Sequence, residues 1–202
     1  MGDQGVRERL KGRELRFFTI FSLLMLFGAG LYGMEQEGQR IGDVLRGLWI
    51  IVISRDALIT DYFELAGYGT AFLNAVIVMS MGLALLRREK ARYTGLTMAA
   101  VFINVGYALW GKNPVNILPI LLGASVYART HGFRMSKYLY TTLFGTSLAP
   151  LVTELIFLLP FNRWINLLIA IGAGTLIGFI GMRPWLWRKA VPGERDPFWQ
   201  RR

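Results

Sequence analysis

The sequence predicts an all-α fold, a polytopic bundle of about six transmembrane helices, from its composition, its apolar runs and the placement of its charges. Of the 202 residues, 53% are hydrophobic and only 18% are charged, whereas about a quarter are charged in soluble domains. Long apolar runs alternate with short basic segments, as in membrane helices and their loops. We therefore attribute the net charge of +10 to basic loops that set the orientation in the membrane and contact anionic lipid headgroups. We expect no nucleic-acid partner.

Six apolar runs are candidates for crossing the bilayer, which takes about 20 residues of helix. The predicted spans are residues 17–34, 65–86, 93–110, 115–128, 138–159 and 164–182. The fourth span has only 14 residues and would reach about 21 Å. Either it thins the bilayer, or the turn at 111–114 before it dips into the membrane. We count it as a crossing because the charges then separate better.

The basic residues predict the orientation. Eighteen of the 23 Lys and Arg residues lie in segments 1–16, 87–92, 129–137 and 183–202. The positive-inside rule places these segments, and thus both termini, in the cytoplasm. The chain is then a basic N-terminal segment, a bundle over residues 17–182 and a basic C-terminal tail in a cell membrane. The first apolar run is too long for a signal peptide and has no A-x-A site after it, which favours a retained helix.

The long connection at 35–64 contains a further helical pattern. Its apolar residues at helical spacing are Ile41, Val44, Leu45, Leu48, Trp49 and Val52. This pattern predicts an amphipathic helix over 41–53 lying in the outer interface. A short re-entrant hairpin packed on the bundle is the open alternative.

Two amides lie deep in the predicted spans. Asn74 and Asn104 are near mid-depth in spans that run in opposite directions, so they could face each other. An interhelical amide contact is one interpretation. A role in lining a solute path is the other, because unpaired polar groups are costly in hydrocarbon.

Charged residues near the outer side form a second candidate group. Glu154 lies within the fifth span, close to its outer end, and Lys112 lies just past the outer end of the third. A carboxylate at that depth needs a partner, and Lys112 is the one we predict. With Asp61 and Glu64 on the same side, the hypothesis is a polar cluster that opens outward. A purely structural ion pair is the alternative.

Two segments break the helical periodicity, at 111–128 and at 145–150. In the first, Asn113 is a good N-cap ahead of a proline, and Asn116 adds another amide. In the second, Pro150 removes one backbone donor inside the fifth span. Non-helical backbone at membrane depth persists only where protein or a water-filled cavity satisfies it, as in transporters. The breaks therefore predict a solute site, and simple kinks are the alternative.

The last span contains a small-residue pattern, with Gly172 and a G-x-x-x-G at Gly174 and Gly178. Such a pattern indicates close packing of this helix against a neighbour.

Four stretches resemble those of one family. They are Ile59-Thr-Asp-Tyr62, Gly69-Thr-Ala-Phe-Leu-Asn-Ala75, Gly111-Lys-Asn-Pro-Val-Asn-Ile-Leu-Pro119 and Phe144-Gly-Thr-Ser-Leu-Ala-Pro-Leu-Val-Thr-Glu154. Over about residues 40–180 the sequence is similar to the N-terminal half of bacterial multi-pass membrane proteins grouped as domain of unknown function 1576. The resemblance implies a polytopic inner-membrane protein without an established activity. Members of that family look longer, with further spans where this chain has its tail rich in Arg, Pro and Trp. That tail is open to interpretation as a lipid-binding segment, a shifted reading frame or a truncation.

The leading functional hypothesis is a small-solute or ion transporter or channel, or half of one, with its path among spans two to five. The candidate path residues are Asp61, Asn74, Asn104, Lys112, Asn113, Asn116 and Glu154. Two acids facing one lysine slightly favour a cationic or proton-coupled solute. The alternative is a non-transporting scaffold or assembly partner, or a truncated fragment without activity of its own.

The residue inventory gives no basis for catalysis or for a cofactor. The chain has no cysteine and one histidine, and His131 lies in a basic loop away from any metal-binding group. No nucleophile–base pair can be assembled, so we expect no enzyme and no cofactor. The expected partners are the lipid bilayer and anionic headgroups on the cytoplasmic side, with a homo-oligomer or a missing C-terminal half as open alternatives.

Overall fold

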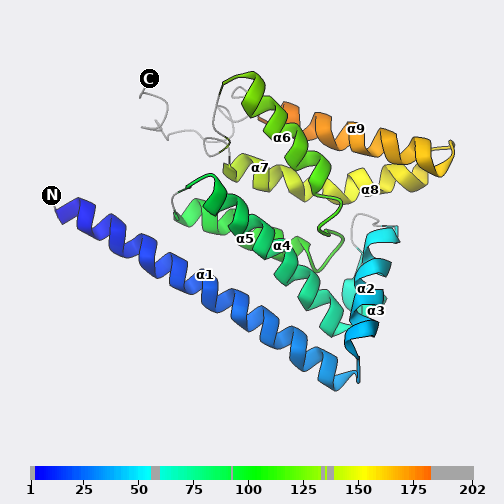
Figure 1. Ribbon diagram of the computed structural model, residues 1–202, viewed down its shortest axis with the longest axis horizontal. Coiled ribbons are helices and arrows are strands. Elements are labelled where there is room, and N and C mark those ends of the chain that lie inside the picture. The colour runs from blue at the N-terminus through cyan, green and yellow to red at the C-terminus, as the bar shows by residue number, and fades with distance from the viewer. Residues whose placement is uncertain (1–2, 56–59, 92, 133–134, 136–138, 183–202) are drawn as a thin grey trace.

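The structure is a computed structural model that describes residues 3–55, 60–91, 93–132, 135 and 139–182, and it is a bundle of helices (Figure 1). No strand occurs within these ranges, so the predicted all-α bundle is confirmed. The predicted basic tail at 183–202 lies outside the described residues.

The helices follow one another with short connections. In chain order they are α1 (Asp3–Gln36), α2 (Ile41–Ile53), α3 (Tyr62–Ala66), α4 (Tyr68–Arg88), α5 (Gly95–Tyr107), α6 (Leu118–Thr130), α7 (Leu139–Gly145), one turn of 3₁₀ helix η2 (Thr146–Leu148), α8 (Ala149–Leu158) and α9 (Arg163–Gly181).

Among the described residues, four stretches are long and apolar enough to cross a membrane. They are Gly12–Gln36, Tyr68–Arg88, Leu139–Leu158 and Arg163–Gly181. The other two predicted positions are filled by α5 and α6, which have 13 residues each and extend about 20 Å. The third predicted span is therefore shorter than expected, and the total of six crossings stays a prediction.

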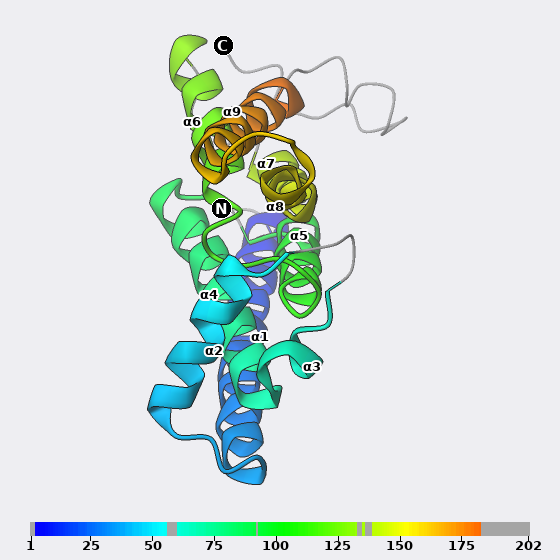
Figure 2. The ribbon, with the colours of Figure 1, turned by 90° about the vertical axis from the view of Figure 1, so that its right-hand side faces the viewer.

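The helices form two groups that lie side by side (Figures 1 and 2). In the first group α4 lies between α1 and α5, with α2 and α3 at one end. In the second, α6 and α8 both pack against α9. α1 and α4 are antiparallel, because Gly30 approaches Leu73 while Gly33 approaches Gly69.

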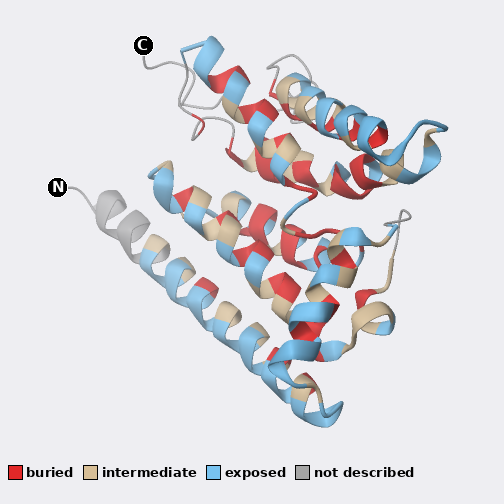
Figure 3. Ribbon diagram, turned by 45° about the vertical axis from the view of Figure 1, so that its right-hand side comes forward, coloured by how far each residue is buried: buried red, intermediate tan, exposed pale blue. Residues whose placement is uncertain are grey.

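The outer faces of both groups are apolar. Phe17 and Leu24 of α1 and Leu168 and Leu176 of α9 are exposed large side chains, and Figure 3 shows exposed residues along most of α1 and α9. An apolar surface of this extent fits the hydrocarbon of a bilayer and would be unusual in water. The fold is thus that of a membrane protein.

α6 and α9 approach each other closely at glycines. A Cβ atom on Gly178 would collide with the backbone oxygen of Ile120, and one on Gly123 with that of Thr175. A Cβ on Gly174 would meet Pro119. The close packing predicted from the G-x-x-x-G pattern is confirmed.

α2 occupies residues 41–53, where the sequence predicts a helix. Val44, Gly47 and Ile51 are its buried residues, and the helix packs against α3 and α4. Its outward side carries the exposed Leu45 and Trp49. Its position in the outer membrane interface stays a prediction.

Candidate functional site

The connection at residues 108–117, between α5 and α6, is irregular and closes on itself. The Asn113 Oδ1 atom accepts hydrogen bonds from the backbone N–H groups of Val115 and Asn116, at 2.9 and 3.0 Å. In return, Asn116 Oδ1 accepts from the Asn113 N–H at 3.0 Å and Asn116 Nδ2 donates to the Gly111 carbonyl at 3.0 Å. These bonds satisfy backbone groups that a non-helical segment would otherwise leave open.

The prediction that Asn113 is the N-cap of α6 is wrong. Asn113 caps the turn instead, and α6 begins only at Leu118, with Pro119 in its first turn. The reason is the pair of bonds between Asn113 and Asn116, which hold the backbone out of helical geometry. Gly111 contributes a φ of +112°, which favours glycine.

The 108–117 connection lies part-way along its neighbours, not at their ends. Asn74, the seventh residue of α4, donates from Nδ2 to the carbonyls of Ala108 and Lys112, at 2.6 and 2.9 Å. The side-chain nitrogen of Lys112 contacts Thr146, which lies near the middle of the 20-residue stretch Leu139–Leu158. Of the two alternatives for the short fourth span, this position favours a turn that dips into the bundle.

Lys112, Thr146 and Asn104 form a buried polar chain. Lys112 has no exposed surface, and its Nζ donates to Thr146 Oγ1 at 2.6 Å. The Thr146 hydroxyl has acceptors in Asn104 Oδ1 at 2.7 Å and the Leu143 carbonyl at 2.6 Å. Asn104 Nδ2 donates to the carbonyls of Ala100 and Leu143, at 2.7 and 3.0 Å. This chain connects α5, the 108–117 connection and η2.

The two predicted helix breaks therefore meet. One contains Lys112, and the other contains Thr146 in η2, between α7 and α8. The sequence analysis identifies the second break through Pro150 and does not select Thr146 as a site residue. A hydroxyl inside a predicted break is the signal that could have found it.

Lys112 lacks a carboxylate partner. Its hydrogen bond goes to a neutral hydroxyl, and the part of the chain that the structure describes contains no ion pair with it. Burying a charged ammonium without a counter-ion costs several kcal/mol. The site thus holds either an uncompensated positive charge or an amine that has lost its proton.

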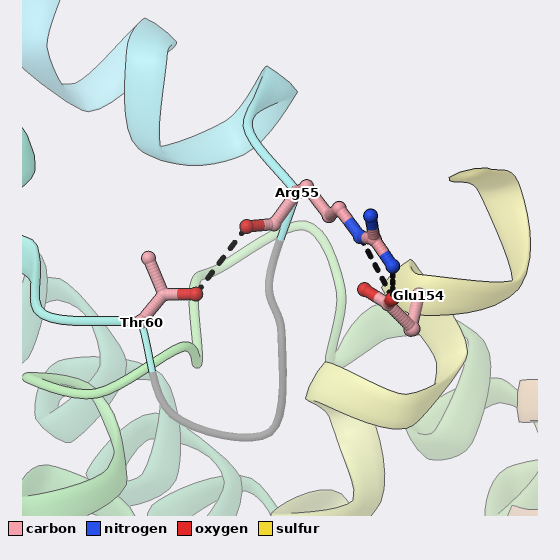
Figure 4. A network of polar contacts seen from close by, with 3 residues as sticks. All are labelled: Arg55, Thr60 and Glu154. Atoms are coloured by element: carbon pink, nitrogen blue, oxygen red, sulfur yellow. Dashed lines mark hydrogen bonds and ion pairs between the residues drawn. The ribbon is translucent and has the colours of Figure 1, made fainter. Parts of the chain in front are cut away.

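Glu154 pairs with Arg55, so the predicted Lys112–Glu154 pair is wrong (Figure 4). Arg55 donates to Glu154 Oε1 from Nε at 2.8 Å and from Nη2 at 2.5 Å. Thr60 donates to the Arg55 carbonyl at 3.3 Å. The hydrogen bond and the negative charge of Glu154 raise the pKa of the Arg55 guanidinium. Arg55 follows α2, and its side chain is 57% exposed against 15% for Glu154.

Among the described residues, no hydrogen bond or ion pair joins Asp61, Glu64, Lys112 and Glu154 to one another, so the predicted outward cluster gains no support. Asp61 caps α3, where its Oδ1 accepts from the backbone N–H groups of Phe63 and Glu64, at 2.8 and 3.4 Å. Glu64 is exposed. Asp61 is thus used as a helix cap, Glu64 faces outward and Glu154 pairs with Arg55. The hydrogen-bond partner of the Lys112 amine is a neutral hydroxyl.

Asn74 and Asn104 bond to backbone carbonyls rather than to each other. The Nδ2 group of each amide therefore holds the backbone of another segment in place, which is a structural role. Asn74 also has a buried Oδ1 atom with no hydrogen-bond partner, an acceptor that a polar solute or a water could use.

A cavity of about 20 Å³ adjoins the polar chain. Its polar lining comes from Asn104 and Thr146, and its apolar lining includes Val78, Val101 and Leu143. This volume has room for about one water molecule. The described form of the protein is therefore closed at this point.

Comparison with known proteins gives one family. A family model described as "Protein of unknown function (DUF1576)" matches residues 41–184, a range that contains every candidate site residue. No curated protein and no solved structure matches the chain. The resemblance seen in the sequence is confirmed, and any activity must be inferred from the site.

Proposed function

The chain belongs to the DUF1576 family of proteins of unknown function, and because that membership assigns no activity, we propose from the site itself that the protein carries a small solute or ion across the membrane. In this proposal it is a transporter or channel without a catalytic step, and its basic ends lie in the cytoplasm.

The observation that carries the proposal is the contact between the two helix breaks, Lys112 Nζ to Thr146 Oγ1 at 2.6 Å. Transporters build their binding sites near the bilayer midplane from broken helices, whose unwound backbone lines the substrate path. An ionisable residue buried in a membrane protein is costly, and it is typical of a substrate or ion pathway. Here one such residue lies in one break and bonds to the other.

A small anion is the solute that would offset a protonated Lys112. From the sequence, two acids facing Lys112 favour a cationic or proton-coupled solute. Glu154 bonds to Arg55 and Asp61 caps α3, so those acids do not offset the lysine. A positive side chain in a pore selects anions.

The polar residues then divide into two roles. Lys112 and Thr146 are the proposed ligands of the anion, because an ammonium and a hydroxyl can donate to it, and Asn104 positions the Thr146 hydroxyl. Asn113 and Asn116 hold the shape of the turn that carries Lys112. Passage requires the 108–117 connection to move relative to η2, because the adjoining cavity accommodates only about one water.

The test is flux into proteoliposomes for a panel of chloride, nitrate, phosphate, acetate and succinate, with sodium and potassium as cation comparisons. We expect flux of at least one anion, and at least a tenfold loss of it in Lys112→Met, because about 1.4 kcal/mol of lost interaction is a factor of ten. Thr146→Val removes the hydroxyl at nearly constant volume and should also reduce flux.

Thr153→Val is the matched control. Thr153 is another buried threonine whose hydroxyl bonds to a helix carbonyl, that of Ala149, and it lacks any bond to Lys112. Flux in this variant should stay within about twofold of wild type, less than 0.5 kcal/mol. Equal losses in Thr146→Val and Thr153→Val would contradict a special role for Thr146.

A non-transporting scaffold is the second candidate. Its support is that the Asn113–Asn116 bonds close the turn and that the adjoining cavity has a volume of only about 20 Å³. In that case Lys112 joins two helices and nothing passes. Folded protein that gives no flux for any ion of the panel would overturn the transport proposal and favour this alternative.

A further inference from the structure

An apolar groove of about 1020 Å³ lies between α2, α4, α6, α8 and α9. α6 contributes Leu118, Leu121 and Leu122 to its wall, and α9 contributes Leu167 and Ile171. The groove is separate from the small cavity at Thr146, although both reach α6. An apolar groove of this size in a membrane protein is filled by an amphiphile or by protein.

Each end of the groove carries an arginine. Arg88, in the last turn of α4, lies at the end predicted to be cytoplasmic, and Arg163, in the first turn of α9, lies at the opposite end beside Trp164. Within the described ranges neither arginine makes an ion pair. The lining thus has free positive charge at its ends and apolar side chains between them.

The Arg88 end has further positive charge around it. Arg129 lies in the last turn of α6, while the lining at this end is Leu85, Ser125 and Met135. Basic residues at the cytoplasmic surface attract the headgroups of anionic lipids.

The length of α6 fits the acyl chains of one leaflet. Its 13 residues extend about 20 Å, and one leaflet of the hydrocarbon core is about 15 Å thick, half of about 30 Å. α6 begins part-way through the bundle, where Asn113 and Asn116 line the groove. A lipid chain that starts at Arg88 would therefore end near the turn that carries Lys112.

A second copy of the chain fits less well. A two-fold axis along the membrane normal through this groove would set Arg88 opposite the same residue at the same depth, and Arg163 likewise. Like charges would face each other at both ends. An anionic headgroup offsets the charge at Arg88 instead.

We propose that this groove binds an anionic phospholipid of the cytoplasmic leaflet, with its phosphate at Arg88 and its acyl chains along α6. The bound lipid fills the space between the two helix groups. This inference does not depend on whether the protein transports anything.

The first test is native mass spectrometry of the full chain, released from mild detergent and titrated with phosphatidylglycerol or with phosphatidylcholine. Wild type should retain phosphatidylglycerol preferentially. Arg88→Gln should weaken that binding about fivefold, since a basic residue near an anionic lipid contributes about 1 kcal/mol. Arg87→Gln is the control, because Arg87 is exposed like Arg88 but does not line the groove. Equal losses in the two variants would overturn the proposal and indicate diffuse charge attraction.

A second variant tests the groove without changing charge. Ser125→Trp places a large side chain in the groove and should lower retention of phosphatidylglycerol, whereas Leu176→Trp, at an exposed position on α9 outside the groove, should not. Unchanged retention in Ser125→Trp would contradict the proposal. So would a wild-type dimer mass that Ser125→Trp abolishes, because it would assign the groove to a second copy.

Discussion

Lys112 and Glu154 carry opposite charges in different surroundings. Lys112 has no exposed surface and a neutral hydroxyl as its partner, whereas Glu154 bonds to an arginine whose side chain is 57% exposed. Exposed ion pairs contribute little to stability because water and salt screen them. The ionisable group of consequence for the site is therefore the buried Lys112 amine and not the Glu154 carboxylate.

The contrast gives a prediction for Glu154→Gln. Because Glu154 bonds to Arg55 and not to Lys112, we expect its flux in proteoliposomes to stay within about twofold of wild type, less than 0.5 kcal/mol. Lys112→Met, measured beside it in the same preparation, should lose most of its flux. A loss in Glu154→Gln as large as in Lys112→Met would return Glu154 to the solute path.

Sequence reasoning at this scale found the unusual residues but not their partners. Asn74 and Asn104 stand out because polar groups are rare in apolar runs, and Lys112 stands out as a charge close to the predicted outer end of a span. All three are buried and bonded. The Arg55–Glu154 pair joins residues 99 positions apart, and the spacing of residues in a chain does not determine such a contact. Depth along the membrane narrows the choice of partner, but it does not distinguish one basic residue from another at a similar level.

At the scale of elements, the helices occur in the predicted order, and the ends of the middle two differ. α5 stops at Tyr107 rather than at 110, and α6 starts at Leu118 rather than at 115. The end of α5 is held by long-range bonds from Asn74 to the carbonyls of Ala108 and Lys112. The start of α6 is delayed by the bonds between Asn113 and Asn116. Hydropathy indicates how long an apolar run is, but not where a side chain from another helix unwinds it.

The α6–α9 contact gives a prediction about glycines. Gly178→Ala would put a methyl group against the backbone of Ile120, so we expect a loss of about 1–3 kcal/mol of stability from overpacking. Gly172→Ala, on the same helix with nothing within 4 Å of its Cβ position, should be neutral or gain up to about 1 kcal/mol. Thermal unfolding in detergent, followed by helical circular dichroism, measures both. Equal melting temperatures for the two variants would contradict the close approach of these helices.

At the scale of the whole molecule, few polar bonds between described residues join the two helix groups. α5 reaches α7 through Asn104 and the Leu143 carbonyl, and α2 is tied to α8 by Arg55 and Glu154. Lys112 and Asn104 add their bonds to Thr146 in η2. Movement of one group against the other must change these bonds, and alternating access in transporters is largely such a movement. The arrangement thus connects the residue-scale site to a motion of the whole fold.

Orientation in the membrane is the last property that the fold leaves to experiment. Eighteen of the 23 basic residues belong to the segments predicted to be cytoplasmic, and the end of α4 at Arg87 is on that side, whereas the end of α1 at Gln36 is on the other. The chain has no cysteine, so single cysteines can be introduced at these two exposed positions.

In intact cells a membrane-impermeant maleimide should label Gln36→Cys, and it should label Arg87→Cys only after permeabilisation, because the positive-inside rule holds basic loops in the cytoplasm. The reverse pattern would invert the topology and, with it, the leaflet assigned to the lipid at Arg88. Labelling of both positions in intact cells would contradict a crossing by α4.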